Sequence, residues 1–237
     1  MRLALALGAV ALAGLVRGFA GFGSAMVMTP PLAALYGPGV AVPIGLLLEL
    51  LLTAPLLPGA ARLVDWRRIG LLAGSAATTV PLGTLVLTRL HPEALRLAIS
   101  AVILAFVVIL ALGWRYTGKP HRAVAVAAGA ASGVLTGAAG IGGPPIVFYV
   151  LSGPDPAGRA RASFITYFAI VDLVAVAASA WAGLLSADVA RHAALFTPAF
   201  LGAAWLGARS FGRAPEGVYR WAALGILVVV ALASLAG

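Results

Sequence analysis

The chain of 237 residues is 62% hydrophobic and only 10% charged, far from ordinary soluble domains, in which roughly a quarter of the residues are charged. This composition indicates an integral membrane protein. The net charge of +9 does not indicate nucleic-acid binding, because most basic residues lie at the ends of apolar segments, where they anchor and orient helices. The chain has no Cys, and its three His show no metal-ligand spacing, so we expect neither a metal nor a cofactor.

Apolar segments follow one another along the chain and predict an all-α polytopic membrane protein that forms a single transmembrane domain over 1–237. Two stretches, 3–36 and 121–152, are apolar but contain clusters of Gly and Pro. The other segments are long enough, at about 20 residues, to cross the membrane. They lie at 41–58, 67–89, 93–114, 160–182, 190–208 and 216–236. We assign the N-terminal residues to the fold rather than to a signal peptide, because 121–137 is their counterpart.

The chain reads as two homologous halves, repeat 1 at about 1–116 and repeat 2 at about 121–237. Three glycines of the first Gly/Pro stretch coincide with three of the second: Gly18, Gly21 and Gly23 with Gly137, Gly140 and Gly142. Farther along, five residues match at one offset of 123: Glu49 with Asp172, Asp65 with Asp188, Arg68 with Arg191, Pro92 with Pro215 and Glu93 with Glu216. These matches indicate a tandem duplication.

The basic residues of the loops distinguish two arrangements of the halves. If each Gly/Pro stretch crosses the membrane once, these residues divide eight against seven between the two sides. If each stretch dips in and returns as a re-entrant helical hairpin, they divide eleven against four, which obeys the positive-inside rule. We therefore predict a hairpin plus three spanning helices per half. An odd number of spans inverts the second half, as in many secondary transporters, and places both termini outside, in the periplasm.

The Gly/Pro breaks themselves predict a binding site. Non-helical backbone at membrane depth is tolerated where it is buried in protein or lines a wet cavity. Gly permits positive φ and close approach of a ligand, and a helix that begins after the break directs its positive end there. Two breaks that face each other near the midplane would suit a small anion. The alternative is that the glycines only allow helices to pack closely.

The two motifs, GFAGFGSAMVMTPPL and GAAGIGGPPIVFYVLSGP, resemble the signatures of the sulfite exporter TauE/SafE family of membrane transporters. The resemblance covers essentially the whole chain. It implies export of small anions, such as sulfite, sulfonates or related organosulfur or carboxylate anions, across the bacterial inner membrane. The first motif has Ser24 and Ala25 where the second has Gly143 and Pro144, so the two sides of the site are chemically unequal.

Side chains next to the breaks complete the predicted site. Arg17 precedes the first motif, where a guanidinium could bind an oxyanion or pair with an acid such as Glu49. The expected substrate-binding residues are Arg17, Gly18, Gly21, Gly23, Ser24, Thr136, Gly137, Gly140, Gly142 and Gly143. Glu49 and Asp172 are acids within apolar spans, and either could carry a proton during transport, neutralise Arg17 or cap a helix. Coupling to protons or to sodium stays open.

Other functions were weighed against an exporter. An importer or a passive anion channel of the same fold stays possible, as does a membrane scaffold. An intramembrane protease is disfavoured, because the chain lacks the Gly-x-Gly-Asp and Gly-x-Ser-Gly patterns and a His deep in a span. We therefore expect no enzyme activity, and we expect a small anion and membrane lipid as partners. The exact substrate, the direction of transport and the oligomeric state are left open by the sequence.

Overall fold

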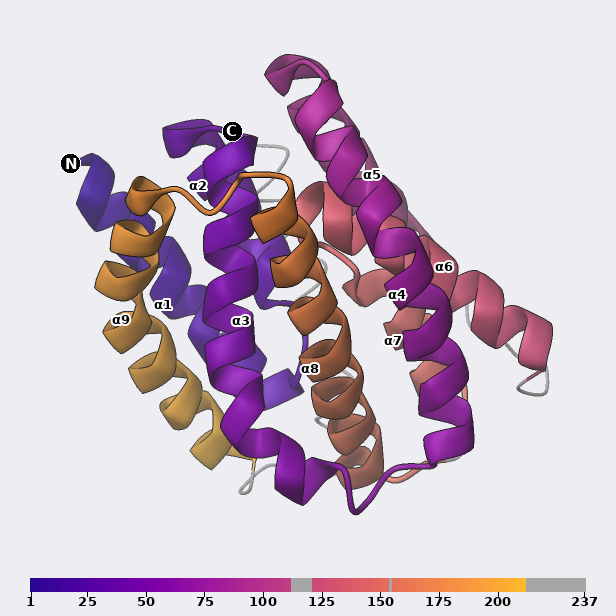
Figure 1. Ribbon diagram of the computed structural model, residues 1–237. Coiled ribbons are helices and arrows are strands. Elements are labelled where there is room, and N and C mark those ends of the chain that lie inside the picture. The colour runs from indigo at the N-terminus through magenta and orange to yellow at the C-terminus, as the bar shows by residue number, and fades with distance from the viewer. Residues whose placement is uncertain (112–120, 154, 212–237) are drawn as a thin grey trace.

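The computed structural model describes residues 1–111, 121–153 and 155–211. This part of the chain contains helices and no strand (Figure 1), as the sequence predicts. The helices are α1 (Arg2–Ala20), α2 (Ser24–Tyr36), α3 (Pro38–Ala60), α4 (Trp66–Arg89), α5 (Pro92–Ala111), α6 (Arg122–Ala139), α7 (Gly143–Leu151), α8 (Ala157–Trp181) and α9 (Ala187–Phe211). The expected span 216–236, with the matched Pro215 and Glu216, lies outside the described residues.

Five of these helices are long and apolar enough to cross a membrane: α1, α3, α4, α6 and α8. They contain between 18 and 25 residues. At 1.5 Å per residue such helices reach roughly 27–38 Å, close to the thickness of the hydrocarbon core. The prediction of a multi-pass membrane protein is therefore confirmed. Because α1 and α6 have 19 and 18 residues, helix length alone does not distinguish a full crossing from a dip.

Both Gly/Pro stretches interrupt helices where the sequence predicts a break. The first break separates α1 from α2 at 21–23, and the second separates α6 from α7 at 140–142. Gly21, Gly23 and Gly140 have φ values of 81°, 92° and 70°, which residues with a Cβ rarely adopt. The N–H of Gly21 donates to the carbonyl of Arg17, and that of Gly140 to the carbonyl of Thr136, both at 2.8 Å. Each helix before a break therefore ends in a left-handed glycine cap.

Glycines also join helices from different halves into two closely packed pairs. Helix α4 packs against α6, where a Cβ on Gly133 would overlap the carbonyl oxygen of Ala76, and one on Gly137 that of Val80. Because the residue numbers rise together along the contact, α4 and α6 run parallel. Helices α1 and α9 pack in the same way. There a Cβ on Gly14 or Gly18 would overlap the carbonyl oxygens of Phe200 and Ala204.

Helices α3 and α8 lie side by side between these two pairs (Figure 1). Helix α3 also contacts α9, and α8 contacts α4. The connection that follows α3 lies at the lower end of the view and the one that follows α8 at the upper end, so the two helices run in opposite directions. These central helices carry the two acids, Glu49 and Asp172, into the interior.

Candidate functional site

Three buried polar side chains meet beside the first break. Arg17 in the last turn of α1 is 3% exposed and Glu49 of α3 is 5% exposed. Nη2 of Arg17 lies 3.0 Å from Oε2 of Glu49, and the hydroxyl of Ser24 donates a hydrogen bond to Oε1 of the same carboxylate. A buried charge is costly without a partner, so Glu49 is what allows Arg17 to remain inside the protein.

One aromatic ring connects this charged cluster to the second break. The guanidinium carbon of Arg17 lies 4.6 Å from the centre of the Phe168 ring, a distance typical of a cation–π contact. A Cβ built on Gly143, the first residue of α7, would lie 4.0 Å from the tip of the same ring. The second break also approaches α2, since a Cβ on Gly140 would lie 3.7 Å from Oγ1 of Thr29. The two halves therefore bring their breaks into one region.

The second break is held by neutral hydroxyl groups. The Ser132 hydroxyl donates to the carbonyl oxygen of Gly142 at 2.5 Å, and the Tyr167 hydroxyl donates to Ser132 at 2.8 Å. Thr136 donates to the carbonyl of Ser132, also at 2.8 Å, and a Cβ on Gly142 would overlap its hydroxyl oxygen. The hydroxyl groups thus find hydrogen-bond partners within this cluster. The residues around the second break, 132–143, include no charged side chain.

Asp172 is the counterpart of Glu49 but has a different environment. It is 3% exposed, and its Oδ2 finds no hydrogen-bond partner among the described residues. It lies one helical turn after Phe168, the residue whose ring contacts Arg17. Since Glu49 has a partner for each carboxylate oxygen, the two matched acids are not equivalent in the folded protein.

A cavity of about 190 Å³ opens onto the first break. Its polar wall consists of Arg17, Thr53 and Arg161, together with Gly18 and Gly21. The rest of the wall is apolar: Leu52, Leu56, Ile165, Leu201, Ala204, Trp205 and Ala208. At about 30 Å³ for each water molecule in the liquid, this volume has room for a small oxyanion and some of its hydration.

Arg161 is a charged residue of this cavity that the sequence did not predict as part of the site. It lies in the first turns of α8, and its Nη2 donates to the carbonyl of Gly18 at 2.9 Å. A Cβ on Gly21 would lie 2.9 Å from Cγ of Arg161, so the missing side chain at Gly21 makes room for this arginine. Only the folded chain brings Arg161 and Gly18 together, because they are 143 residues apart in sequence.

The predicted substrate residues fall into groups with different surroundings. Arg17, Gly18 and Gly21 line the cavity, whereas Ser24 is engaged by Glu49 and Gly23 caps α2. Gly18 and Gly137 also lie at the close contacts between paired helices, where packing alone requires a glycine. Thr136, Gly140, Gly142 and Gly143 surround the second break. Their roles as ligands remain predictions. Within the described ranges, no cluster of three or more His, Cys, Asp or Glu could hold a metal ion.

The helical architecture and its apolar helices define a multi-pass membrane protein. The chain belongs to the sulfite exporter TauE/SafE family, whose profile matches residues 6–234. A relative from Cupriavidus necator, named "Probable sulfite/organosulfonate exporter TauE", is 31% identical over 176 residues, which cover 73% of this chain and 69% of the relative. No solved structure matches the chain. The family confirms the resemblance seen in the motifs and makes this protein a membrane transporter rather than an enzyme.

Proposed function

We propose that this protein is a secondary transporter that exports sulfite, sulfonates or related small organosulfur or carboxylate anions across the bacterial inner membrane. The printed name of the relative supports the substrate class. The observation that carries the proposal is the cavity at the first break, in which two guanidinium groups, Arg17 and Arg161, share a wall with glycine backbone. Guanidinium groups bind oxyanions through paired hydrogen bonds, and the absence of Cβ atoms lets an anion approach the chain closely.

The charges around this cavity suggest how binding is coupled to a proton. Among the four described residues Arg17, Arg161, Glu49 and Asp172, the two arginines are balanced by the two acids when both acids are ionised. Because Glu49 is engaged by Arg17 and Ser24, Asp172 is the acid better placed to accept a proton. A proton on Asp172 leaves one net positive charge, which matches a monoanion. Coupling to sodium is the alternative, and a sodium gradient imposed in the same flux assay tests it.

An inverted repeat is the architecture that we propose for the transporter. Under the sequence duplication, α1 corresponds to α6 and α4 corresponds to α9. The parallel pair α1–α9 is thereby exchanged with the parallel pair α6–α4, and α3 with its antiparallel neighbour α8. This exchange is what a pseudo-twofold axis in the membrane plane produces.

The same comparison supports re-entrant hairpins at the two breaks. The starts of α1 and α3 both lie at the upper end of Figure 1, so α1 and α2 together return to the side from which they began. Arg67, Arg68 and Arg122 line one cavity at the starts of α4 and α6, at the opposite end from the start of α9, which contains Arg191. A single crossing at each break would require Arg191 and Arg68 on one side. The hairpin arrangement separates them, with both termini in the periplasm.

Flux into and out of liposomes that contain the purified protein tests the function. We expect saturable flux of sulfite and of a small sulfonate such as methanesulfonate, with acetate as the carboxylate comparison. Flux that rises without saturation would favour a passive channel, and no flux of any of these anions would reject the proposal. Periplasmic reporters inserted at 61–65 and at 152–156 test the topology. Hairpins place both positions in the cytoplasm, whereas single crossings place one of them in the periplasm, so activity at only one of the two positions would contradict the hairpins.

A further inference from the structure

A second cavity, of about 310 Å³, lies where α4 and α6 begin. Its lining consists of Asp65, Arg67, Arg68, Leu71, Arg122 and Tyr149. It shares no lining residue with the cavity at the first break. Because α4 and α6 run parallel, the positive ends of both helix dipoles point toward this cavity, in addition to the three guanidinium groups.

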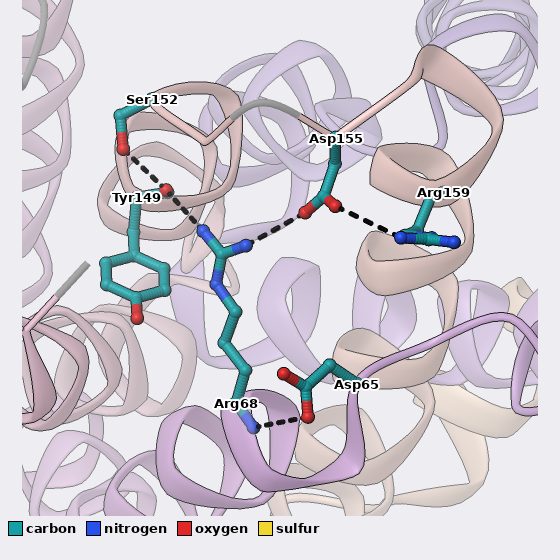
Figure 2. A network of polar contacts seen from close by, with 6 residues as sticks. All are labelled: Asp65, Arg68, Tyr149, Ser152, Asp155 and Arg159. Atoms are coloured by element: carbon teal, nitrogen blue, oxygen red, sulfur yellow. Dashed lines mark hydrogen bonds and ion pairs between the residues drawn. The ribbon is translucent and has the colours of Figure 1, made fainter. Parts of the chain in front are cut away.

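One of the three arginines is fixed in place (Figure 2). Nη1 of Arg68 lies 2.8 Å from Oδ2 of Asp155, and its Nη2 donates to the carbonyl of Tyr149 at 3.2 Å. Its guanidinium carbon also lies 4.7 Å from the centre of the Tyr149 ring. Nη1 of Arg159 lies 3.7 Å from Oδ1 of Asp155. Arg68 therefore forms a fixed cationic wall of the cavity.

The other two arginines, Arg67 and Arg122, are exposed, and neither forms an ion pair within the described part of the chain. The acid of the cavity does not neutralise them. Oδ1 of Asp65 accepts the backbone N–H groups of Arg67 at 2.9 Å and of Arg68 at 3.4 Å, as the N-cap of α4. Two exposed guanidinium groups thus line the same cavity as the fixed one.

We propose that this cavity is a membrane-surface site for an oxyanion group, bound by Arg67, Arg68 and Arg122 and separate from the transport cavity. A phospholipid headgroup and a soluble anion both carry this chemistry. The surroundings favour the headgroup. Leu71 in the cavity wall is exposed, and Trp66, which is 53% exposed, has the amphipathic ring of an interfacial anchor. Basic pockets between helices at the membrane surface are suited to anionic headgroups.

Binding of dihexanoyl phosphatidylglycerol to the purified full-length protein tests the site, with dihexanoyl phosphatidylcholine and sodium sulfite as the other probes. Arg67→Gln and Arg122→Gln are each expected to weaken phosphatidylglycerol binding about tenfold, because each removes a charge-assisted contact. Arg62→Gln is the matched control. It removes one charge from an exposed position just before α4, outside the cavity, and is expected to bind as wild type does.

The probes distinguish the two sources of the oxyanion. Binding of phosphatidylglycerol that depends on Arg67 and Arg122, and that sulfite does not displace, supports a lipid site. Sulfite binding with the same dependence, and none by phosphatidylglycerol, supports a site for a soluble anion. The proposal is overturned if neither phosphatidylglycerol nor sulfite binds. It is also overturned if Arg67→Gln, Arg122→Gln and Arg62→Gln bind these probes equally well.

Discussion

The two breaks share a backbone design but not a chemistry. Gly21 and Gly140 end their helices with the same left-handed cap and the same hydrogen bond to a carbonyl four residues earlier. Around the first break, however, a buried ion pair and a cavity with two arginines surround the backbone. Around the second break, Ser132, Thr136 and Tyr167 form a chain of neutral hydrogen bonds.

This difference shows what the proposed duplication keeps and what it leaves free to change. Gly21 and Gly140 both adopt a positive φ, but Gly23 has a φ of 92° and its counterpart Gly142 a φ of −80°, so only the first glycine of each break shares its conformation. The side chains around the cap are not constrained in this way. The counterpart of Arg17 in the second half is Thr136.

Breaking the buried ion pair at the first break should have the largest effect on stability. Glu49→Gln leaves Arg17 buried without a compensating charge, and we expect a loss of about 3–5 kcal/mol in the free energy of unfolding. Thermal unfolding in detergent measures it. The double variant Arg17→Met, Glu49→Met is the control, because replacing a buried pair with apolar residues of similar size is often neutral. An unchanged melting temperature in Glu49→Gln would show that the pair does not hold the first break.

The two cap glycines should respond differently to the same substitution. Gly21→Ala combines a positive φ with a Cβ 2.9 Å from Cγ of Arg161. Gly140→Ala has only the positive φ, because its Cβ would lie 3.7 Å from Oγ1 of Thr29, an ordinary contact distance. We expect a loss of about 1–2 kcal/mol for Gly140→Ala, as for other residues forced into this region, and more for Gly21→Ala. Anion flux and thermal unfolding of both variants measure the difference. Gly8→Ala, on an open face of α1, is the control. Equal effects of the two cap variants would show that the close approach of Arg161 to position 21 does not affect stability or flux.

Arg161 tests the cationic side of the site without disturbing the buried ion pair. Arg161→Gln removes one guanidinium from the cavity wall but leaves Arg17 and Glu49 paired. We expect anion affinity to fall by about 1.5–3 kcal/mol, the contribution of a hydrogen bond to a charged group. Equilibrium binding of sulfite to the purified variant measures it, with Arg62→Gln as the charge control. Affinity equal to that of wild type would place the anion elsewhere.

Asp172 should have the smallest effect on stability and the most specific effect on coupling. Because its Oδ2 makes no hydrogen bond to described residues, Asp172→Asn should change the free energy of unfolding by less than about 1 kcal/mol. A proton that moves with a monoanion cancels its charge, so wild-type flux should follow a pH gradient and ignore the membrane potential. In Asp172→Asn the anion should move alone and respond to the potential. Liposome flux under each gradient separates these cases, and a variant with the wild-type response would make Asp172 structural.

The sequence predicted those features that depend on neighbouring residues. The breaks appear at the expected glycines because Gly and Pro act on their own backbone, and the spans at 41–58, 67–89 and 160–182 coincide with α3, α4 and α8 to within a few residues. The sequence allowed Arg17 to pair with Glu49, and this ion pair forms in the folded protein.

Features that depend on distant residues were not predictable in the same way. Phe168 and Arg161 acquire their contacts only when helices from different halves meet, and Ser132 only when α6 meets α8 of the same half. Nothing in their local sequence indicates those contacts. Glycine at helical spacing is equally consistent with a ligand site and with close helix packing. Gly18 shows why, since it lines the cavity and also touches Ala204 of α9.

The start of α8 connects two polar regions of the molecule. Arg159 joins the ion network at the start of α4, and Arg161, two residues later, donates to the carbonyl of Gly18 at the first break. Two neighbouring residues of one helix therefore join regions whose residues Arg68 and Gly18 line different cavities.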